Sequence, residues 1–308
     1  MSLIITGASG QFARLVTRTL CENTPASELI LVSRNPDSLA DLAAQGKQVR
    51  YGDFDNAASL EAAFAGGERM LLISTLSVGR RADQHRRAIH AAAKAGVKHI
   101  VYTSSGGARP DNPAIVIPDH LATEAALRTS GLAYTVLRDS LYAEAVVLEI
   151  APRMLAVGQW SSAAGEGRSP FVWKADCAAV AAKVLTTAGH ENRTYELTGP
   201  ALVSFRDAAS LTAEICGRPL PFVPITDEQL TAALAAAGVP HKYIERMNTP
   251  GVGTSSIEDI VSYEQGLRGG FFEVLSTDVH TILGRPPRSL RDLFQENARL
   301  LRGAAPVH

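Results

Sequence analysis

The chain has 308 residues, of which 46% are apolar and 20% charged, and its formal net charge is −1. This balance is typical of a globular protein and gives no electrostatic reason to expect nucleic acid or an anionic membrane as a partner. No basic N-terminal stretch precedes an apolar segment, and no window holds the roughly 18 apolar residues that a membrane span needs. Cys21, Cys177 and Cys216 are scattered without metal-ligand spacing, so we expect reduced thiols in a cytoplasmic protein with no metal site.

The first half of the chain alternates short apolar runs with longer patterns of helical spacing. We expect strands at residues 2–6, 29–33, 49–51, 70–74, 99–103 and 134–137. Helices are expected between them, at residues 11–20, 36–45, 57–65, 82–95 and 120–130. The strands are continuously apolar, which is typical of a parallel sheet covered on both faces. The alternation therefore predicts an α/β fold with a doubly wound parallel sheet and right-handed crossovers.

The second half is less regular and predicts a smaller, mainly helical region. Residues 152–167 are rich in small and polar side chains and predict a loop or hairpin. Residues 176–188 predict a helix with Asp176 as its N-cap, and residues 194–197 predict a strand that returns to the sheet. Further helices are expected at residues 205–216, 227–237, 241–247, 278–283 and 290–301, and a mobile Gly-rich loop at residues 248–256.

A glycine-rich turn follows the first strand and opens the first helix. Its sequence is Gly7-Ala8-Ser9-Gly10-Gln11-Phe12-Ala13. Such a turn directs backbone N–H groups and the positive end of a helix at one point, which suits a pyrophosphate. Gly7 permits the tight turn, Gly10 permits close approach of the phosphate, and Ala13 replaces the third glycine of the usual motif. The turn predicts a dinucleotide-binding Rossmann domain over residues 1–150, to which residues 176–200 return, and a smaller substrate-binding region over residues 151–308.

The end of the second strand selects between the two nicotinamide dinucleotides. An acidic residue at this place binds the free ribose 2′-hydroxyl of NAD. This chain has Arg34 there, and the first acidic residue after the strand, Asp37, fits the start of the next helix. A guanidinium makes bidentate, charge-assisted hydrogen bonds to a phosphate. Arg34 therefore favours NADP(H) over NAD(H) as the cofactor.

Other residues at the ends of strands are also expected to contact the cofactor, because ligands bind at the carboxyl ends of strands in open α/β sheets. Asp53 and Phe54 follow the third strand and would flank the adenine. The ribose and the nicotinamide would pass the residues after the fourth and fifth strands, which are Ser74, Thr75, Leu76, Ser104 and Ser105.

Five segments together resemble the NmrA-like atypical short-chain dehydrogenase/reductases. They are ITGASGQ at residues 5–11, SRNP at 33–36, LAAQG at 42–46, AAAKAGVKHIVYTS at 91–104 and YTVLR at 134–138. Within that family the chain is most similar to bacterial NADPH:quinone oxidoreductases and triphenylmethane reductases, over nearly its whole length. The resemblance implies that NAD(P)H binds at Gly7–Phe12, Arg34, Ser74–Thr75 and Thr103–Ser104, and that the substrate lies near the loop after Leu137.

A conventional catalytic pair is missing from the sequence. Short-chain dehydrogenases commonly use Tyr-x-x-x-Lys, and none of the seven tyrosines here has a lysine four residues further on. Several relatives carry a lysine at the start of the helix after the fifth strand, in a Lys-x-x-x-Glu pattern. His120 and Glu124 stand at that place here, and the quinone-reductase branch resembles this chain in the histidine. His120 could protonate or orient the substrate oxygen, although a histidine bonded to backbone or to Glu124 is equally compatible.

The loop after Leu137 is the other place where chemistry is expected. The related quinone reductases tend to carry asparagine and an aromatic residue there, and Asp139 and Leu141 depart from that pattern. Tyr142 is a second candidate catalytic residue. The expected substrate contacts are Asp139, Tyr142, Phe171 and Trp173, whose aromatic rings could form a flat wall. Core packing explains these aromatic residues equally well.

These features predict a reductase that passes hydride from NADPH to a quinone or a related conjugated aromatic or polycyclic acceptor. A quinone accepts hydride readily, so a protein that positions donor and acceptor needs no Tyr–Lys pair. A variant of this prediction is a pathway-specific reductase of a ketone or an enone. The alternative is a non-catalytic, NADP-sensing regulator that binds a protein partner, although the chain shows no DNA-binding motif. We expect a small aromatic or quinone-like substrate, no nucleic acid, no membrane, and a monomer or homodimer.

Overall fold

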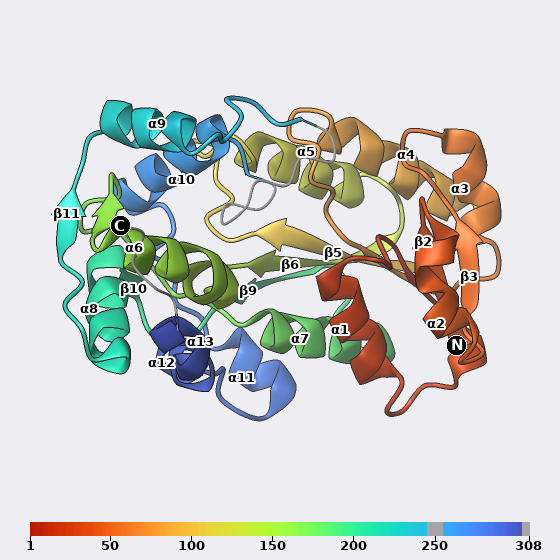
Figure 1. Cartoon of the computed structure of the whole chain (residues 1–308). Helices are drawn as coiled ribbons and strands as arrows, with labels where there is room; N and C mark the ends of the chain where they lie inside the picture. The colour runs from red at the N-terminus through yellow and green to blue at the C-terminus, as the bar shows by residue number, and fades with distance from the viewer. Residues whose placement is uncertain (245–254, 304–308) are drawn as a thin grey trace.

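The computed structural model describes residues 1–244 and 255–303, and its centre is a sheet of seven strands (Figure 1). They are β1 (Leu3–Ile5), β2 (Leu29–Ser33), β3 (Gln48–Tyr51), β4 (Arg69–Leu72), β5 (His99–Ser105), β6 (Ala133–Asp139) and β9 (Arg193–Leu197). The strands lie in the order β3-β2-β1-β4-β5-β6-β9, and every neighbouring pair is parallel. The chain moves outward from β1 to β3 and then crosses to β4 on the other side of β1. That reversal opens a crevice at the carboxyl ends of β1 and β4, where ligands bind in such sheets.

Helices cover both faces of this sheet. One face packs against α1 (Gln11–Leu20), α7 (Lys174–Thr186) and α11 (Asp278–Leu283), and the other against α3 (Ala57–Phe64), α4 (Arg81–Lys94) and α5 (Ile117–Arg128). Successive residues of a strand serve opposite faces, since Leu3 and Ile5 belong to the first core and Ile4 to the second. This double coverage is the reason that the strands are apolar throughout. The predicted doubly wound α/β fold is confirmed.

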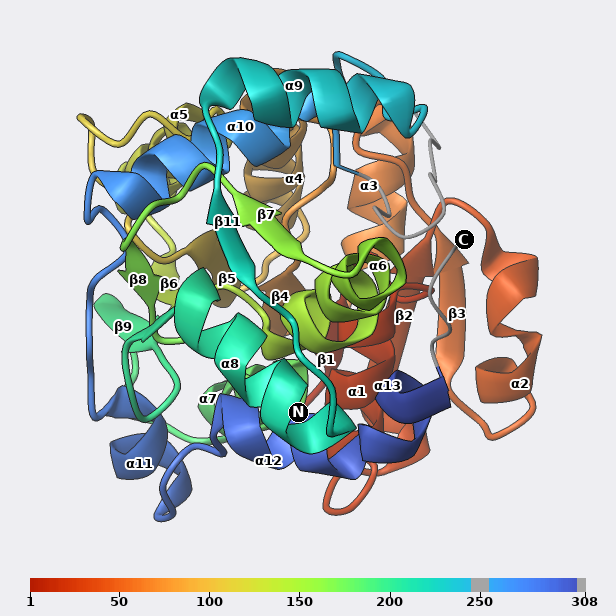
Figure 2. The same cartoon turned by 60° about the vertical axis from the view of Figure 1, so that its left-hand side comes forward.

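The second region of the chain lies beyond the carboxyl ends of β5 and β6, and Figure 2 brings it forward. Its helices are the π-helix η3 (Ala145–Ile150), α6 (Ala151–Val157), α8 (Phe205–Cys216), α9 (Asp227–Ala236), α10 (Ile257–Arg268), α12 (Leu290–Glu296) and α13 (Ala298–Gly303). Two small sheets join them, one of β7 (Trp160–Ser162) with β11 (Phe222–Pro224) and one of β8 (Arg168–Ser169) with β10 (Val203–Ser204). Among the described residues, no helix is long and apolar enough to cross a bilayer.

The prediction of a loop or hairpin over residues 152–167 is wrong for its first part. This segment forms most of α6 and all of β7. Pro152 lies where the π-helix η3 runs directly into α6, so the change from π to α hydrogen bonding falls at the residue that has no N–H to donate. Leu155 and Trp160 are buried in the core of the second region, which compensates for the many small and polar neighbours. Gly158, with a φ of +83°, ends the helix.

Asp176 does not cap α7, because this helix begins two residues earlier, at Lys174. The carboxylate of Asp176 is instead buried, and it accepts hydrogen bonds from Arg285 Nη2 at 2.7 Å and from the Arg288 backbone N–H at 2.9 Å. Asp176 therefore does not cap its own helix but forms an ionic contact that joins α7 to the segment before α12.

Other boundaries also differ from the predictions. The segment at residues 36–45 divides into a 3₁₀ helix, η2 (Pro36–Leu39), and a short α2 (Ala40–Ala43), and another 3₁₀ helix, η1 (Ala26–Glu28), precedes β2. Helix α5 begins three residues before His120, and the predicted helix at residues 290–301 breaks at Asn297 between α12 and α13.

The segment before α10 is only partly described. Residues 241–244 form no helix, while residues 245–247 of the predicted helix and 248–254 of the predicted loop lie outside the described residues. Helix α10 was not expected from the sequence, because its interior Gly266 weakens the helical pattern. Serine is nevertheless a preferred N-cap residue. Ser256 has this role in the structure, where its Oγ accepts a hydrogen bond from the Asp259 N–H at 3.2 Å.

The buried Asp176 contact generates a prediction about stability. We expect Asp176→Ala to lower the free energy of unfolding by about 1–3 kcal/mol, because it leaves the Arg288 N–H and the Arg285 guanidinium without their acceptor. Urea denaturation followed by circular dichroism measures this change. Asp41→Ala is the matched control, since the Asp41–Arg14 ion pair is exposed and surface pairs contribute little. Equal losses in the two variants would contradict the importance of the buried contact.

Candidate active site

The turn between β1 and α1 leaves the N-terminus of α1 open. Gly7 has a φ of +58°, which favours glycine, and a Cβ at Gly10 would lie only 3.2 Å from the Gly7 carbonyl oxygen. No described side chain caps α1, whereas serine or threonine side chains cap α8, α9, α10 and α12. The first N–H groups of α1, which include those of Gln11 and Phe12, therefore have no capping partner. This geometry fits the pyrophosphate of a dinucleotide.

The end of β2 lies beside this turn. The Ala8 N–H donates to the Val32 carbonyl at 3.0 Å, and the Ser33 and Ser9 hydroxyl oxygens are 3.5 Å apart. Ser33 is buried and its Oγ accepts from the Asn35 N–H, whereas the next residue, Arg34, is exposed. Arg34 is thereby placed at the rim of the glycine-rich turn, where a ribose 2′-phosphate can reach it.

Lys174 is a cation near this turn that no sequence motif predicts. Its Nζ lies 3.4 Å from Gln11 Oε1 and 5.4 Å from the centre of the Tyr142 ring. It comes to this place because α1 and α7 pack together on one face of the sheet. The Glu144 carboxylate accepts hydrogen bonds from the Lys174 backbone N–H and fixes the start of α7. No local pattern could reveal Lys174, since 163 positions separate it from Gln11.

The residues predicted after β4 and β5 meet at the carboxyl edge of the sheet. The Ser74 N–H donates to Thr103 Oγ1 at 2.9 Å, and the Thr75 N–H donates to His85 Nε2 at 3.2 Å. Leu76, next along the loop, has 56% of its surface exposed. Ser104 faces away from this group, because its hydroxyl is buried and donates to Glu124 Oε1 at 2.8 Å. The structure therefore brings Ser74, Thr75 and Thr103 together and assigns the Ser104 side chain to the interior.

Asp53 and Phe54 lie in the turn after β3. The Asp53 N–H donates to Ser59 Oγ at 3.0 Å, which orders the turn into α3. The Phe54 ring packs edge-on against the His85 ring, with 6.2 Å between their centres. Both residues remain candidates for the adenine end of the cofactor, and Phe54 also belongs to the packing around α4.

His120 has no free ring nitrogen in this structure. Arg81 Nη1 lies 2.9 Å from His120 Nε2, and Tyr102 Oη lies 2.8 Å from His120 Nδ1. Because a guanidinium only donates, Nε2 must accept, and the proton of the neutral ring therefore sits on Nδ1. Burial, together with the Arg81 charge, holds the pKa of His120 well below its usual range. The geometry thus does not support His120 as a proton donor to substrate. The alternative, a His120 ring bonded to backbone or to Glu124, is not observed either, because the two ring nitrogens contact Arg81 and Tyr102.

Asp139, which is buried, and Tyr142, which is half-buried, form a hydrogen-bonded pair. The Tyr142 hydroxyl donates to Asp139 Oδ2 at 2.5 Å, and the Cys177 thiol also lies within hydrogen-bonding reach of this carboxyl. Burial raises the pKa of Asp139 to about 7, and burial and Asp139 raise the pKa of Tyr142. The Tyr142 ring stacks on Phe12, with 6.2 Å between their centres. Tyr142 therefore lies against the glycine-rich turn, with its hydroxyl proton committed to Asp139.

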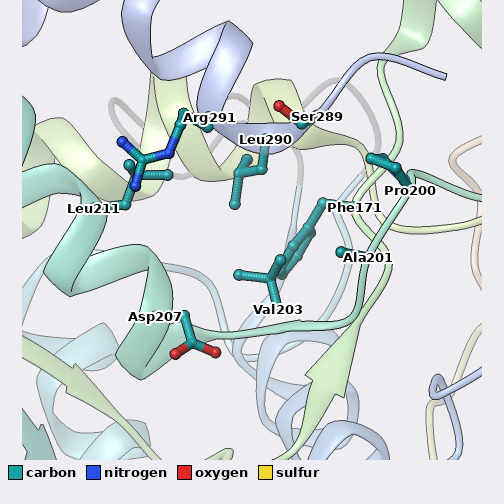
Figure 3. Close-up of a pocket in the computed structure, with 9 residues that line it drawn as sticks. All are labelled: Phe171, Pro200, Ala201, Val203, Asp207, Leu211, Ser289, Leu290 and Arg291. Carbon is teal, nitrogen blue, oxygen red and sulfur yellow. The ribbon is translucent and has the colours of Figure 1, made fainter. Parts of the chain in front are cut away.

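Phe171 and Trp173 belong to the packed interior. Phe171 stacks on Phe205 with 6.0 Å between ring centres, and Trp173 Nε1 donates to the Ser289 carbonyl at 2.8 Å. Phe171 also borders a cavity of about 260 Å³ between α8 and α12 (Figure 3). Among the described residues that line this cavity, Phe171 is the single predicted site residue. The expected aromatic wall around Tyr142 is therefore not assembled from these two residues.

The raised pKa of Asp139 predicts a pH-dependent stability. The ordinary value is 3.8, so between about pH 4 and about pH 7 the folded protein holds a proton that the unfolded chain has lost. This contribution to stability is present at low pH and disappears as the pH rises through 7. Asp139→Asn cannot ionise, so we expect its free energy of unfolding to rise relative to wild type between about pH 5 and about pH 8.

Urea denaturation of both proteins at these two pH values measures the difference. Taking the difference cancels the other titrating groups, including His85 and His99, whose pKa values burial lowers to about 3 and about 4. Asp111→Asn, on an exposed loop, is the matched control and should show no such trend. A difference between Asp139→Asn and wild type that does not vary with pH would show that Asp139 is ionised in the folded protein.

Comparison with known proteins supports a nucleotide site at this edge of the sheet. A family model described as NAD(P)H-binding matches residues 7–188. Quinone oxidoreductase 2 of Escherichia coli is 36% identical over 290 residues, which are 94% of this chain and 96% of that protein. The crystal structure of the NADPH-dependent quinone oxidoreductase of Escherichia coli complexed with NADPH has a TM-score of 0.86 and 34% identity, and the match covers 97% of this chain and 99% of that one.

A second solved structure gives the same similarity. The triphenylmethane reductase of Citrobacter sp. complexed with NADP(H) has a TM-score of 0.86 and 32% identity, and the match covers 97% of this chain and 100% of that one. The resemblance noted in the sequence is thus confirmed over both regions of the chain. The chain belongs to the NAD(P)H-binding family, among the NmrA-like atypical short-chain dehydrogenase/reductases.

Proposed function

We propose that this protein is a reductase that transfers hydride from NADPH to a quinone or a related conjugated aromatic acceptor. The observation that carries the proposal is the uncapped N-terminus of α1, with Arg34 at its rim and Lys174 beside Gln11. Two positive side chains and a helix N-terminus at the switch point of a parallel sheet suit a phosphorylated dinucleotide. Relatives of 32–36% identity are named as quinone and triphenylmethane reductases, which supports a conjugated acceptor.

NADPH is preferred over NADH for a chemical reason. Arg34 stands where an acidic residue would hold the free 2′-hydroxyl of NAD, and a guanidinium pairs with phosphate through two parallel hydrogen bonds. Both solved relatives described above were crystallised with NADPH or NADP(H), in agreement with this preference.

The residues of this chain would bind and orient rather than exchange protons. When bound, the cofactor supplies the hydride. Ser74, Thr75 and Thr103 hold the loop after β4 against β5, and Tyr142 with Phe12 forms an aromatic surface beside the glycine-rich turn. We assign His120 a positioning role, because it holds Arg81, whose Nε donates to the Thr75 carbonyl oxygen at 2.5 Å. Holding donor and acceptor in register and excluding water is the main contribution of these residues, because a quinone accepts hydride readily.

The compartment is also part of the proposal. Cys21, Cys177 and Cys216 are unpaired, and burial raises the pKa of Cys177 well above its ordinary value, which makes it a poor nucleophile. Unpaired thiols suit the cytoplasm, where reducing systems keep them so.

Arg34 tests the choice of cofactor. We expect Arg34→Glu to weaken NADPH binding by about 100-fold or more, because a bidentate charge-assisted pair is replaced by repulsion, while NADH binding changes little. Isothermal titration calorimetry with each dinucleotide measures both dissociation constants. Arg193→Glu, exposed at the amino end of β9, controls for the change of net charge. Equal losses for NADPH and NADH would show that Arg34 does not contact the 2′-phosphate.

The acceptor class is tested by turnover. Purified protein should oxidise NADPH, followed at its absorbance band, when given simple benzoquinones and naphthoquinones, and should do so faster than with isolated ketones or enones. Faster turnover of a ketone or enone would favour the variant prediction of a pathway-specific reductase. Tight NADPH binding with no turnover across the quinone panel would instead favour a dinucleotide-sensing regulator.

A further inference from the structure

Helix α10 brings a phenol to the carboxyl end of β5. Tyr263 lies in the middle of α10, and its hydroxyl lies near the Ser105 side chain. Ser105 is the last residue of β5, two positions after Thr103. Since side chains alternate along a strand, Ser105 lies on the same face as Thr103, which contacts Ser74. Tyr263 therefore reaches the side of the sheet edge where the candidate active site lies.

The Tyr263 ring is held rigidly. It stacks on Phe272 with 4.4 Å between ring centres and 2° between ring planes. Phe272 is itself fixed between two glycines, because a Cβ at Gly107 or Gly266 would lie 2.8 Å or 2.6 Å from its ring atoms. Gly107 belongs to the loop after β5 and Gly266 to α10, so the same packing joins the two elements. A phenol held in this way has little orientational freedom to lose when a ligand binds.

Tyr263 also keeps its proton. Burial, with the neighbouring Asp259 carboxylate one turn earlier on α10, raises the pKa of Tyr263 above its ordinary value. Burial likewise raises the pKa of Asp259, while the Arg81 charge opposes that change. The hydroxyl is thus a neutral hydrogen-bond donor at neutral pH, and its torsion lets it turn from Ser105 to another oxygen.

The other candidate donors described above are already committed. Tyr142 donates to Asp139, and both His120 nitrogens are engaged by Arg81 and Tyr102. Tyr102 is fully buried against His120. Tyr263 differs from these residues because its described neighbour is Ser105, a small hydroxyl at the sheet edge. Ser105 Oγ donates to the Gly106 carbonyl oxygen at 3.0 Å, a neutral acceptor that it can exchange for an oxygen shared with Tyr263.

We propose that Tyr263, together with Ser105, donates a hydrogen bond to the oxygen of the hydride acceptor that becomes negatively charged during hydride transfer. This inference rests on the proposed function. Two electrons and a hydrogen nucleus pass from NADPH to the acceptor, its oxygen becomes anionic, and a proton from solvent completes the hydroquinone. Tyr263 is unchanged at the end of the step. Two hydroxyls at a charge-developing oxygen form the kind of preorganised donor pair that stabilises oxyanions.

A cationic triphenylmethane dye distinguishes this role from a structural one. Its central carbon takes the hydride and the cation is neutralised, so no oxygen gains charge and no donor is needed. We therefore expect Tyr263→Phe, which retains the ring stacked on Phe272, to lower kcat for a benzoquinone by about 100-fold. The same variant should reduce the dye at a rate within about twofold of wild type. Tyr195→Phe, whose hydroxyl contacts His190 on the last strand, is the matched control for loss of a phenol.

A binding measurement provides a readout independent of turnover. The absorbance of 4-nitrophenol reports its ionisation, and the wild-type protein should lower the pKa of the bound ligand by stabilising the phenolate. We expect Tyr263→Phe, and to a smaller extent Ser105→Ala, to abolish this shift while the melting temperature stays near that of wild type.

Three outcomes are decisive. Equal losses with quinone and dye, or an unchanged quinone rate, would overturn the inference. If the wild-type protein reduces quinones but not the dye, an unchanged nitrophenol titration in Tyr263→Phe would overturn it. If wild type reduces neither acceptor, the proposed function itself fails, and the nitrophenol titration alone decides whether Tyr263 binds an oxyanion.

Discussion

The backbone N–H groups at the start of α1 are the constraint on which the rest of the structure depends. A helix N-terminus without a capping side chain leaves donors unsatisfied unless water or a ligand accepts from them. Here the parallel sheet brings the carboxyl ends of β1, β2, β4 and β5 to the same edge, so that Arg34, Ser74 and Thr103 lie on the edge where those donors are. The packing of α7 on α1 adds Lys174. Gly7 is favoured by its φ of +58°, and a Cβ at Gly10 would crowd the Gly7 carbonyl oxygen at 3.2 Å.

A second feature is a set of buried histidine side chains that are neutral and fully hydrogen-bonded, and so are not available for proton transfer. His85 and His120 are held neutral by burial and by Arg81, and each uses both nitrogens within the protein. They tie α4 and α5 to the loop after β4. Buried polar groups whose hydrogen bonds are all formed favour a single arrangement of the surrounding side chains. Any displacement would leave donors or acceptors unpaired in a medium of low dielectric constant. These residues therefore act by fixing the edge of the sheet, which is consistent with an enzyme whose work is to position two reactants.

The second region and the loop that leads to it bring two tyrosine side chains to the carboxyl edge of the sheet. Its helix α10 places Tyr263 beside Ser105, and the loop after β6 places Tyr142 over Phe12. Both tyrosines keep their protons, but Tyr142 donates to a carboxyl and Tyr263 adjoins a hydroxyl. The cavity beside Phe171 is separate from this group, since neither Tyr142 nor Tyr263 is among the described residues that line it; apart from Phe171, these come from α8, α12, β10 and the segments before β10 and α12. The choice of hydride acceptor would then depend on the region whose helices and strands were hardest to predict from the sequence.

The sequence by itself determined the doubly wound sheet, the glycine-rich turn and the cation that follows β2, because each depends on local periodicity or on adjacent residues. It also carried the family resemblance. Only the tertiary structure decided the roles of side chains that meet across long separations. His120 is a plausible acid in the sequence but is engaged by Arg81, 39 positions away, and Lys174 reaches Gln11 across 163. Burial and hydrogen-bond partners set whether a titratable group is available for chemistry, and the linear order of residues contains neither of them.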